Sequence, residues 1–134
     1  MILHDEAAMI EYGSHLAATL KPPVVLELIG DVGAGKTTLV KGIAKYFSID
    51  EPVTSPSFVL NKKYHGMDNI IISHYDFYRL LDPGIMSEEL NESVSDPHTI
   101  TIVEWAETVA HVLPEDRKTI RIKYLDDDSR EVTL

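Results

Sequence analysis

The strongest constraint on this chain is one eight-residue segment, Gly30-Asp31-Val32-Gly33-Ala34-Gly35-Lys36-Thr37. It matches the pattern G-x-x-x-x-G-K-[ST] at every fixed position. The glycines of such a segment permit tight turns and close approach, so that successive N–H groups point at phosphate oxygens. The lysine reaches the β- and γ-phosphates, and the threonine hydroxyl ligates Mg²⁺. We therefore expect a loop that holds the phosphates of a nucleoside triphosphate together with Mg²⁺.

The residues on both sides of this segment have the patterns that a phosphate-binding loop requires. The short β-rich run Val24–Ile29 stops at a glycine and predicts a buried strand. Residues 36–47 carry apolar side chains at helical spacing and predict a helix, whose positive end adds to the site. Strand, loop and helix thus follow the order of a P-loop. The expected nucleotide contacts are Asp31, Val32, Gly33, Ala34, Gly35, Lys36, Thr37 and Thr38.

Thr38 allows two interpretations, because it either hydrogen-bonds the α-phosphate or is an ordinary residue of the first helical turn.

The rest of the chain alternates between helical and strand patterns. Asp5 is expected to cap a helix that runs to about Leu20. The later elements are expected to be strands over 58–64 and 70–75 that form a hairpin, a short, acidic and solvated helix over 87–94, a strand over 99–103, a helix over 105–113, and strands over 119–125 and 130–134.

No internal repeat, low-complexity tract or linker divides these elements. The predicted fold class is therefore α/β, a single P-loop NTPase domain over residues 1–134 with a central mixed β-sheet flanked by helices. The length of 134 residues suits one domain.

The composition indicates a soluble protein and argues against direct nucleic-acid binding. Its 12 basic and 22 acidic residues give a net charge of −10, whereas a free-standing nucleic-acid binder normally carries excess positive charge. The absence of cysteine excludes a disulfide framework and a thiolate zinc site. The N-terminus lacks the basic and apolar features of a signal peptide, and no apolar run approaches the roughly 20 residues that span a bilayer. We expect a cytoplasmic protein without a membrane segment.

Hydrolysis of a triphosphate needs, besides the loop, a carboxylate that organises Mg²⁺ directly or through water. Two acidic residues end apolar strand patterns. Glu104 follows Ile100-Thr101-Ile102-Val103, where a Walker B carboxylate is expected, and Asp76 follows residues 70–75. A helix cap or a surface carboxylate is the alternative for each one alone. Two such residues in one P-loop chain favour a catalytic pair that acts with Lys36.

Other polar and aromatic residues also allow two interpretations. His74 is either a relay or a buried core histidine, and we favour the structural role. Arg79 either touches a γ-phosphate or makes a surface salt bridge. Trp105 either packs against a partner or belongs to the core. The segment Thr54-Ser55-Pro56-Ser57 lies where many P-loop enzymes place a hydroxyl-bearing switch residue, and we assign Thr54 to the catalytic set.

Four segments carry a resemblance to a known family. They are Gly30-Asp31-Val32-Gly33-Ala34-Gly35-Lys36-Thr37-Thr38, Thr54-Ser55-Pro56-Ser57-Phe58, His74-Tyr75-Asp76-Phe77-Tyr78-Arg79-Leu80 and Val103-Glu104-Trp105. Together they resemble the TsaE (YjeE) proteins, bacterial P-loop ATPases required for threonylcarbamoyladenosine formation in tRNA. The generic loop is shared by many proteins, whereas H-x-D-x-Y-R-L and E-W in this order are specific.

The resemblance implies that the nucleotide is ATP. It also implies docking on a complex of two related proteins, TsaB and TsaD homologues, which transfers the threonylcarbamoyl group, so that tRNA is reached indirectly. Glu104 and Thr37 would hold Mg²⁺, with Asp76 and the 54–57 segment as switch elements. The family usually has a threonine near the adenine. In this chain the residue at that position is Met9, so Met9 is expected to lie next to the nucleotide.

Two further departures from the family pattern concern the later segments. Ser57 replaces the last threonine of T-S-P-T, and the segment Ser87-Glu88-Glu89-Leu90-Asn91-Glu92 lacks the usual glycine.

Two other functions use the same loop. A small-molecule kinase usually needs an arginine-bearing lid, and none of the arginines at 79, 117, 121 and 130 lies in an obvious lid. A nucleotide-gated binding module would bind without significant turnover. Because an arginine finger is not evident, we expect the isolated protein to hydrolyse ATP slowly.

Overall fold

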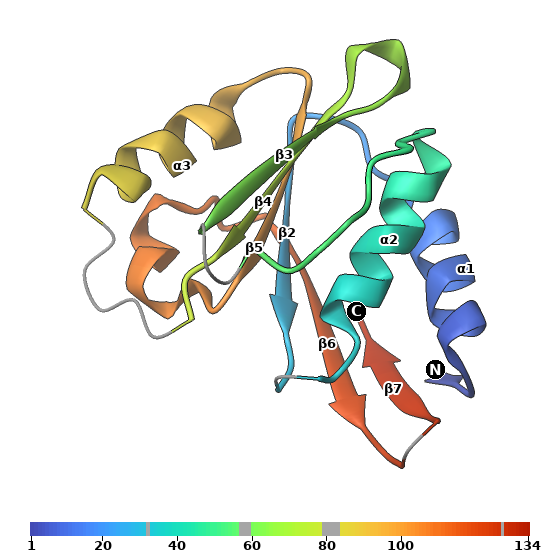
Figure 1. Ribbon diagram of the computed structural model, residues 1–134. Helices are drawn as coiled ribbons and strands as arrows, with labels where there is room; N and C mark the ends of the chain where they lie inside the picture. The colour runs from blue at the N-terminus through green and yellow to red at the C-terminus, as the bar shows by residue number, and fades with distance from the viewer. Residues whose placement is uncertain (32, 57–59, 79–83, 127) are drawn as a thin grey trace.

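The computed structural model describes residues 1–31, 33–56, 60–78, 84–126 and 128–134. Within these residues, seven strands form one mixed sheet in the order β1-β7-β6-β2-β5-β4-β3 (Figure 1). The strands are β1 (Ile2–Leu3), β2 (Val24–Ile29), β3 (Asn61–His65), β4 (Ile71–Asp76), β5 (Thr99–Glu104), β6 (Lys118–Tyr124) and β7 (Arg130–Thr133). The helices are α1 (Glu6–Ala17), α2 (Lys36–Tyr46), α3 (Ile85–Ser95) and the 3₁₀ segments η1 (Met67–Asn69) and η2 (Ala106–Val112). The predicted α/β fold is confirmed.

The centre of the sheet is parallel and its margins are antiparallel. Strands β6, β2, β5 and β4 run in one direction, whereas β3 pairs antiparallel with β4 and β7 pairs antiparallel with β6. All six residues of β5 are buried. This is the expected environment of a parallel strand that is covered on both faces.

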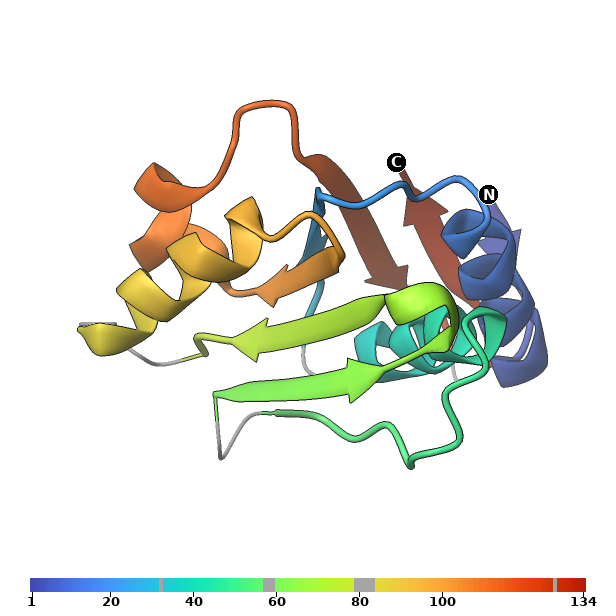
Figure 2. The ribbon, with the colours of Figure 1, turned by 90° about the horizontal axis from the view of Figure 1, so that it is seen from above.

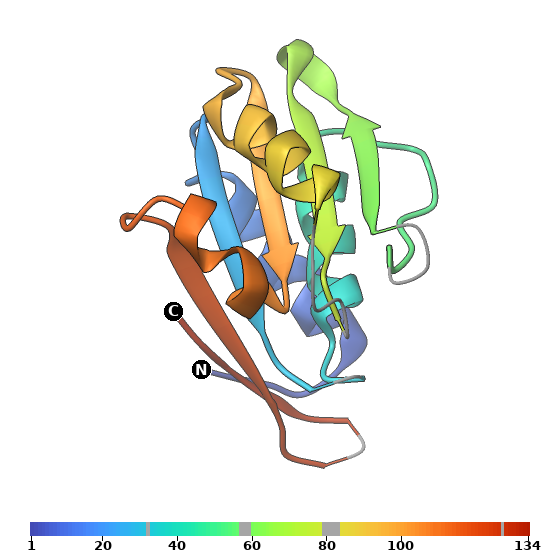
Figure 3. The ribbon, with the colours of Figure 1, turned by 90° about the vertical axis from the view of Figure 1, so that its left-hand side faces the viewer.

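Two layers of helices cover the opposite faces of this sheet (Figures 2 and 3). On one face, α1 and α2 pack on alternate strand residues such as Leu26, Leu28 and Ile102. On the other face, α3 and η2 pack on residues of the opposite parity, including Val25 and Val103. The period of two along each strand therefore divides the apolar residues between two cores.

Helices α1 and α2 approach each other at two glycines. A Cβ atom at Gly13 would lie 2.5 Å from the backbone oxygen of Leu39, and one at Gly42 would overlap the backbone oxygen of Ile10. Only glycine fits at either position without displacing backbone. This close contact fixes α2, whose first residue is Lys36, against the first helix.

Most of the predicted elements are confirmed. Strand β2 has the predicted bounds, and α1 is capped by Asp5, whose Oδ1 accepts a hydrogen bond from the N–H of Ala8 at 2.7 Å. Helix α1 ends at Ala17 instead of near Leu20. The predicted hairpin is present as β3 and β4, although residues 57–59 of its first segment lie outside the described residues.

Three expectations need correction. The segment predicted as a helix over 105–113 is the 3₁₀ segment η2, and Trp105 before it has left-handed backbone angles. Helix α3 starts before the predicted residue 87 and is not wholly solvated, because Leu90 is completely buried on the sheet. Strand β1 was not predicted. In the described parts of the chain, no helix combines the length and the apolar character needed to cross a bilayer.

Candidate phosphate-binding site

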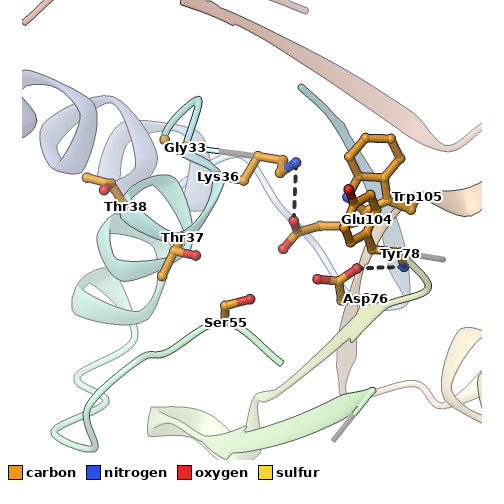
Figure 4. A pocket seen from close by; sticks show the side chains of 10 residues that line it. Gly33, Lys36, Thr37, Thr38, Ser55, Asp76, Tyr78, Glu104 and Trp105 are labelled. Atoms are coloured by element: carbon orange, nitrogen blue, oxygen red, sulfur yellow. Dashed lines mark hydrogen bonds and ion pairs between the residues drawn. The ribbon is translucent and has the colours of Figure 1, made fainter. Parts of the chain in front are cut away.

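The carboxyl ends of the central parallel strands bring the predicted site residues to one edge of the sheet. Glu104 is the register partner of Leu28 in β2 on one side and of Asp76 in β4 on the other. The glycine-rich loop begins two residues after Leu28. A cavity of about 270 Å³ opens at this edge (Figure 4). It is lined by Gly33, Gly35, Lys36, Thr37, Thr38, Ser55, Asp76, Tyr78, Glu104 and Trp105.

The loop owes its shape to glycines at particular positions. Gly33 and Gly35 have φ angles of 84° and 112°, a left-handed region that side chains disfavour. Gly30 is needed for a different reason, since a Cβ there would lie 2.7 Å from the backbone oxygen of Ile122. Gly35 is the N-cap of α2, so the loop leads directly into the positive end of an 11-residue helix. Backbone N–H groups and the helix dipole at this point favour an anion.

Lys36 places a buried cation between the loop and the carboxylates. Its Nζ donates to the backbone oxygen of Gly30 and, at 3.4 Å, to that of Asp31. The same atom lies 3.6 Å from Oε1 of Glu104 and 4.8 Å from the centre of the Trp105 ring. Lys36 is only 7% exposed, so its charge is held in place by these oxygens and this ring.

The two carboxylates are both buried, at 3% exposure each. Oε2 of Glu104 lies 2.5 Å from Nε2 of His74, which is itself completely buried. Oδ1 of Asp76 accepts a hydrogen bond from the N–H of Tyr78 at 2.8 Å. The structural role favoured for His74 agrees with this burial, whereas its contact with Glu104 could not be predicted from local residue patterns. Among the described residues, Nδ1 of His74 has no hydrogen-bond partner.

The segment after α2 contributes a different residue from the one expected. Ser55 lines the cavity (Figure 4). Thr54 is not among the residues that line it. The hydroxyl of Thr54 accepts a hydrogen bond from Lys62, and its backbone N–H lies 3.4 Å from the Tyr64 hydroxyl. Ser57 lies outside the described residues. The structure therefore attaches Thr54 to β3 and brings Ser55 to the cavity, and the catalytic assignment of Thr54 stays a prediction.

Two aromatic side chains that sequence reasoning did not assign to the site form one wall of the cavity. The rings of Tyr78 and Trp105 lie 4.7 Å apart. Trp105 has φ and ψ of 55° each, a strained conformation for a bulky residue, and this turns its ring toward Lys36. The position of Tyr78, two residues after Asp76, could have indicated that this tyrosine lies at the site. Arg79 and Val32 lie outside the described residues.

A second cavity, of about 260 Å³, adjoins the first along the loop. Gly33, Gly35 and Thr38 line both cavities. The residues specific to the second cavity are Asp5, Glu6, Met9, Asp128 and Arg130. Met9 thus lies beside the loop, and its Cε would be 3.2 Å from a Cβ at Gly35.

Asp31 and Ala34, two other residues predicted to contact the nucleotide, are joined to each other within the loop, and their contact with nucleotide stays a prediction. The backbone oxygen of Asp31 accepts a hydrogen bond from the N–H of Ala34 at 3.0 Å. Ala34 is buried at 1% exposure. These contacts stabilise the turn from within.

A glycine-rich loop between a parallel strand and a helix, with carboxylates at the ends of neighbouring strands, is the arrangement of the P-loop class of α/β proteins. Comparison with known proteins identifies a family within this class. The model of the family described as threonylcarbamoyl adenosine biosynthesis protein TsaE matches residues 3–132. The chain belongs to the TsaE family, as the resemblance of its motifs predicted.

Individual relatives agree with this assignment. The chain is 41% identical over 120 residues to the tRNA threonylcarbamoyladenosine biosynthesis protein TsaE of Bacillus subtilis, with 88% of this chain and 73% of the relative covered. It is 37% identical to the TsaE protein of Rickettsia bellii, with 96% and 89% covered. A crystal structure of Bacillus subtilis YdiB superposes with a TM-score of 0.81 at 34% identity, covering 98% of this chain and 80% of the other. The role of the family lies in tRNA threonylcarbamoyladenosine biosynthesis.

Proposed function

We propose that this protein is an ATPase that binds ATP with Mg²⁺ in the cavity at the glycine-rich loop. Its hydrolysis of ATP would support a complex of TsaB and TsaD homologues, which modifies the adenosine next to the anticodon of tRNA with a threonylcarbamoyl group. The transfer of that group takes place on the partner complex. The protein itself supplies a nucleotide-dependent step.

The observation that carries the proposal is the convergence of one buried cation and two buried carboxylates beside the loop. Lys36, Asp76 and Glu104 all line the same cavity, and each is at most 7% exposed. Burying three charged side chains is costly unless they bind one another or a charged ligand. A triphosphate with Mg²⁺ would meet Lys36 through its phosphates and the carboxylates through its metal ion.

The residues present fit Mg²⁺. The ion prefers oxygen ligands and is commonly held by one or two carboxylates together with substrate phosphates. The hydroxyl of Thr37 and the carboxylates of Glu104 and Asp76 face one cavity (Figure 4). Thr37 and Glu104 would hold the ion, which when bound neutralises charge that develops on the phosphates.

The carboxylate of Asp76 is held differently from that of Glu104, because it accepts the N–H of Tyr78 two residues later. Asp76 is the last residue of β4. We assign to Asp76 the positioning of the attacking water, and to Ser55 a contact with the nucleotide or its metal ion. Membership of the TsaE family supports the partner assignment, and the net charge of −10 suits a protein partner better than tRNA itself.

The test measures three quantities on the purified protein. These are ATP affinity by calorimetry, ATP hydrolysis alone, and hydrolysis with purified TsaB and TsaD homologues. We expect binding that requires Mg²⁺, slow turnover alone and faster turnover with the partners. Threonylcarbamoyladenosine in tRNA should fall in cells depleted of the protein. Binding without turnover under both conditions would identify a nucleotide-gated binding module instead, and normal tRNA modification after depletion would contradict the role.

A further inference from the structure

Arg130, the first residue of β7, connects two segments that lie far apart in the chain. Its Nε donates to the backbone oxygen of Ala34 at 3.0 Å, and Nη2 lies 3.5 Å from the backbone oxygen of Gly33. On its other side, Nη1 donates to the backbone oxygens of Asp126 at 2.8 Å and Ser129 at 3.0 Å. One guanidinium therefore joins the turn between β6 and β7 to the glycine-rich loop after β2.

The described residues of the turn before Arg130 are joined by hydrogen bonds of their own. Oδ1 of Asp126 accepts hydrogen bonds from the N–H groups of Ser129 at 2.8 Å and Asp128 at 3.0 Å. The guanidinium carbon of Arg130 lies 4.6 Å from the centre of the Tyr124 ring, which supports it from one side. Arg130 thus reaches the loop from described residues of the turn that are bonded to one another.

The contact determines how one peptide of the loop is oriented. In a planar trans peptide the C=O and the N–H of the next residue point in opposite directions. Because the C=O of Ala34 points at Arg130, the N–H of Gly35 points away from it. Gly35 lines this cavity and has a φ of 112°, a backbone conformation open to glycine, so the bond from Arg130 to the Ala34 oxygen helps to fix this peptide. A reversed peptide would instead present a carbonyl oxygen to an anion.

The four contacts require the shape of an arginine. A guanidinium is a rigid fork with five donors, so Nε and Nη1 of Arg130 can serve the loop and the turn at the same time. An ammonium group at this position would keep the charge, but it is a compact point charge on a flexible stem. The contacts made by Nε and Nη1 would not both survive the exchange.

We propose that Arg130 is a positioning residue that holds the Ala34–Gly35 peptide in the orientation that binds phosphate. The turn between β6 and β7 thereby sets the affinity of the loop for nucleotide. This inference rests on the proposed nucleotide binding, and it adds a residue from the opposite end of the chain to the determinants of that binding.

The experiment compares Arg130→Lys, Arg130→Gln and the control Lys123→Gln in the full chain. Lys123 is exposed on β6 of the same hairpin, so the control removes one positive charge without touching the loop. ATP and ADP affinities are measured by calorimetry with Mg²⁺. The amide resonances of Ala34 and Gly35 are recorded by NMR in the nucleotide-free protein, and thermal unfolding is followed for each variant.

We expect both Arg130 variants to bind ATP and ADP about 10-fold more weakly, the size of effect that follows from losing a charge-assisted hydrogen bond. Both should shift the Gly35 amide resonance, while Lys123→Gln changes neither quantity. Wild-type affinity and an unshifted resonance in Arg130→Lys would overturn the proposal. Weak binding by Arg130→Gln alone would also overturn it, because charge and not placement would then be responsible.

The design still tests the proposal if one variant does not fold or if the protein binds no nucleotide. If Arg130→Gln does not fold, Arg130→Lys decides alone, since it keeps the charge. If the wild-type protein binds no nucleotide, the proposed function fails, but the resonances still test the contact. A shift in Arg130→Lys without a shift in Lys123→Gln supports the positioning role, and no shift contradicts it.

Discussion

Nε2 of His74 lies 2.5 Å from Oε2 of Glu104, across two neighbouring strands, and both side chains are buried. The other carboxylate oxygen of Glu104 lies 3.6 Å from Nζ of Lys36. Both oxygens of this carboxylate are therefore engaged by nitrogen atoms on different elements. The imidazole on one side leaves Oε1 directed at the cavity, where the lysine and the expected metal ion would compete for it.

The contact between His74 and Glu104 should matter for turnover. His74→Gln places an amide nitrogen near the position of Nε2, whereas His74→Leu removes the donor and keeps an apolar side chain in the core. We expect kcat to fall about 10-fold in His74→Leu, equivalent to ~1.4 kcal/mol, with a smaller change in ATP affinity. Steady-state kinetics at saturating Mg²⁺ would measure this. Equal rates in the two variants would show that the hydrogen bond has no functional effect.

Substitution of Lys36 should mainly affect binding. Lys36→Ala removes a buried cation that we expect to contact the β- and γ-phosphates. We expect ATP affinity to fall about 100-fold or more, in line with ~3 kcal/mol for a charge-assisted contact. Lys41→Ala is the matched control, because Lys41 is exposed on the same helix. Titration calorimetry measures both, and similar affinities in the two variants would contradict the assignment.

Substitution of Glu104 should separate turnover from binding. Glu104→Ala removes a proposed Mg²⁺ ligand while the loop and Lys36 remain, so hydrolysis should decrease more than nucleotide affinity. Glu107→Gln provides a control at an exposed acidic residue on η2, three residues further along the chain. The measurement is Mg²⁺-dependent phosphate release together with ATP affinity. An equal loss of both quantities would argue against a role in the chemical step.

The segment after α2 offers a direct comparison of two hydroxyl residues. Ser55 lines the cavity and Thr54 is bonded to Lys62. We therefore expect Ser55→Ala to lower kcat more than Thr54→Ala. Thr54→Ala should change the free energy of unfolding by at most about 1 kcal/mol, because it loses one exposed hydrogen bond. The opposite order of kcat values would restore Thr54 as the switch residue.

The contact between α1 and α2 gives a prediction for stability in which two effects have opposite signs. Helix propensity alone predicts that Gly42→Ala stabilises the protein by about 1 kcal/mol. The new Cβ would overlap the backbone oxygen of Ile10, and we expect this to dominate, with a net loss of about 1–3 kcal/mol. Chemical denaturation of Gly42→Ala and of Lys41→Ala, an exposed neighbour, measures the difference. A stabilised Gly42→Ala would show that the helices can separate at little cost.

Local patterns were sufficient where the structure is determined locally. The strand before the loop and the cap at Asp5 follow from a few adjacent residues, and the ends of β4 and β5 could be located from apolar runs. Strand β1 could not be predicted, because two residues gain their structure from pairing with β7 at the far end of the chain. The choice between Thr54 and Ser55 also depends on the path of a loop, and alternation of residue types does not encode it.

The left-handed backbone of Trp105 is a further case. The residue types around Trp105 do not predict this conformation. It occurs directly after the buried end of β5 and directs the ring into the cavity. The contacts of Arg130 likewise join residues nearly a hundred positions apart. Sequence patterns identified which chemical groups the site contains, whereas tertiary packing determines which of them meet.

The register between β4 and β5 has a consequence for how this site tolerates change. Asp76 and Glu104 are opposite each other on adjacent strands, so the backbone ladder sets the spacing of the carboxylates. Replacing side chains in the core can alter packing while this spacing stays the same. A single-residue insertion or deletion within either strand would shift the carboxylate by about 3.3 Å and turn it to the opposite face of the sheet. The length of these two strands is therefore under stricter control than their composition.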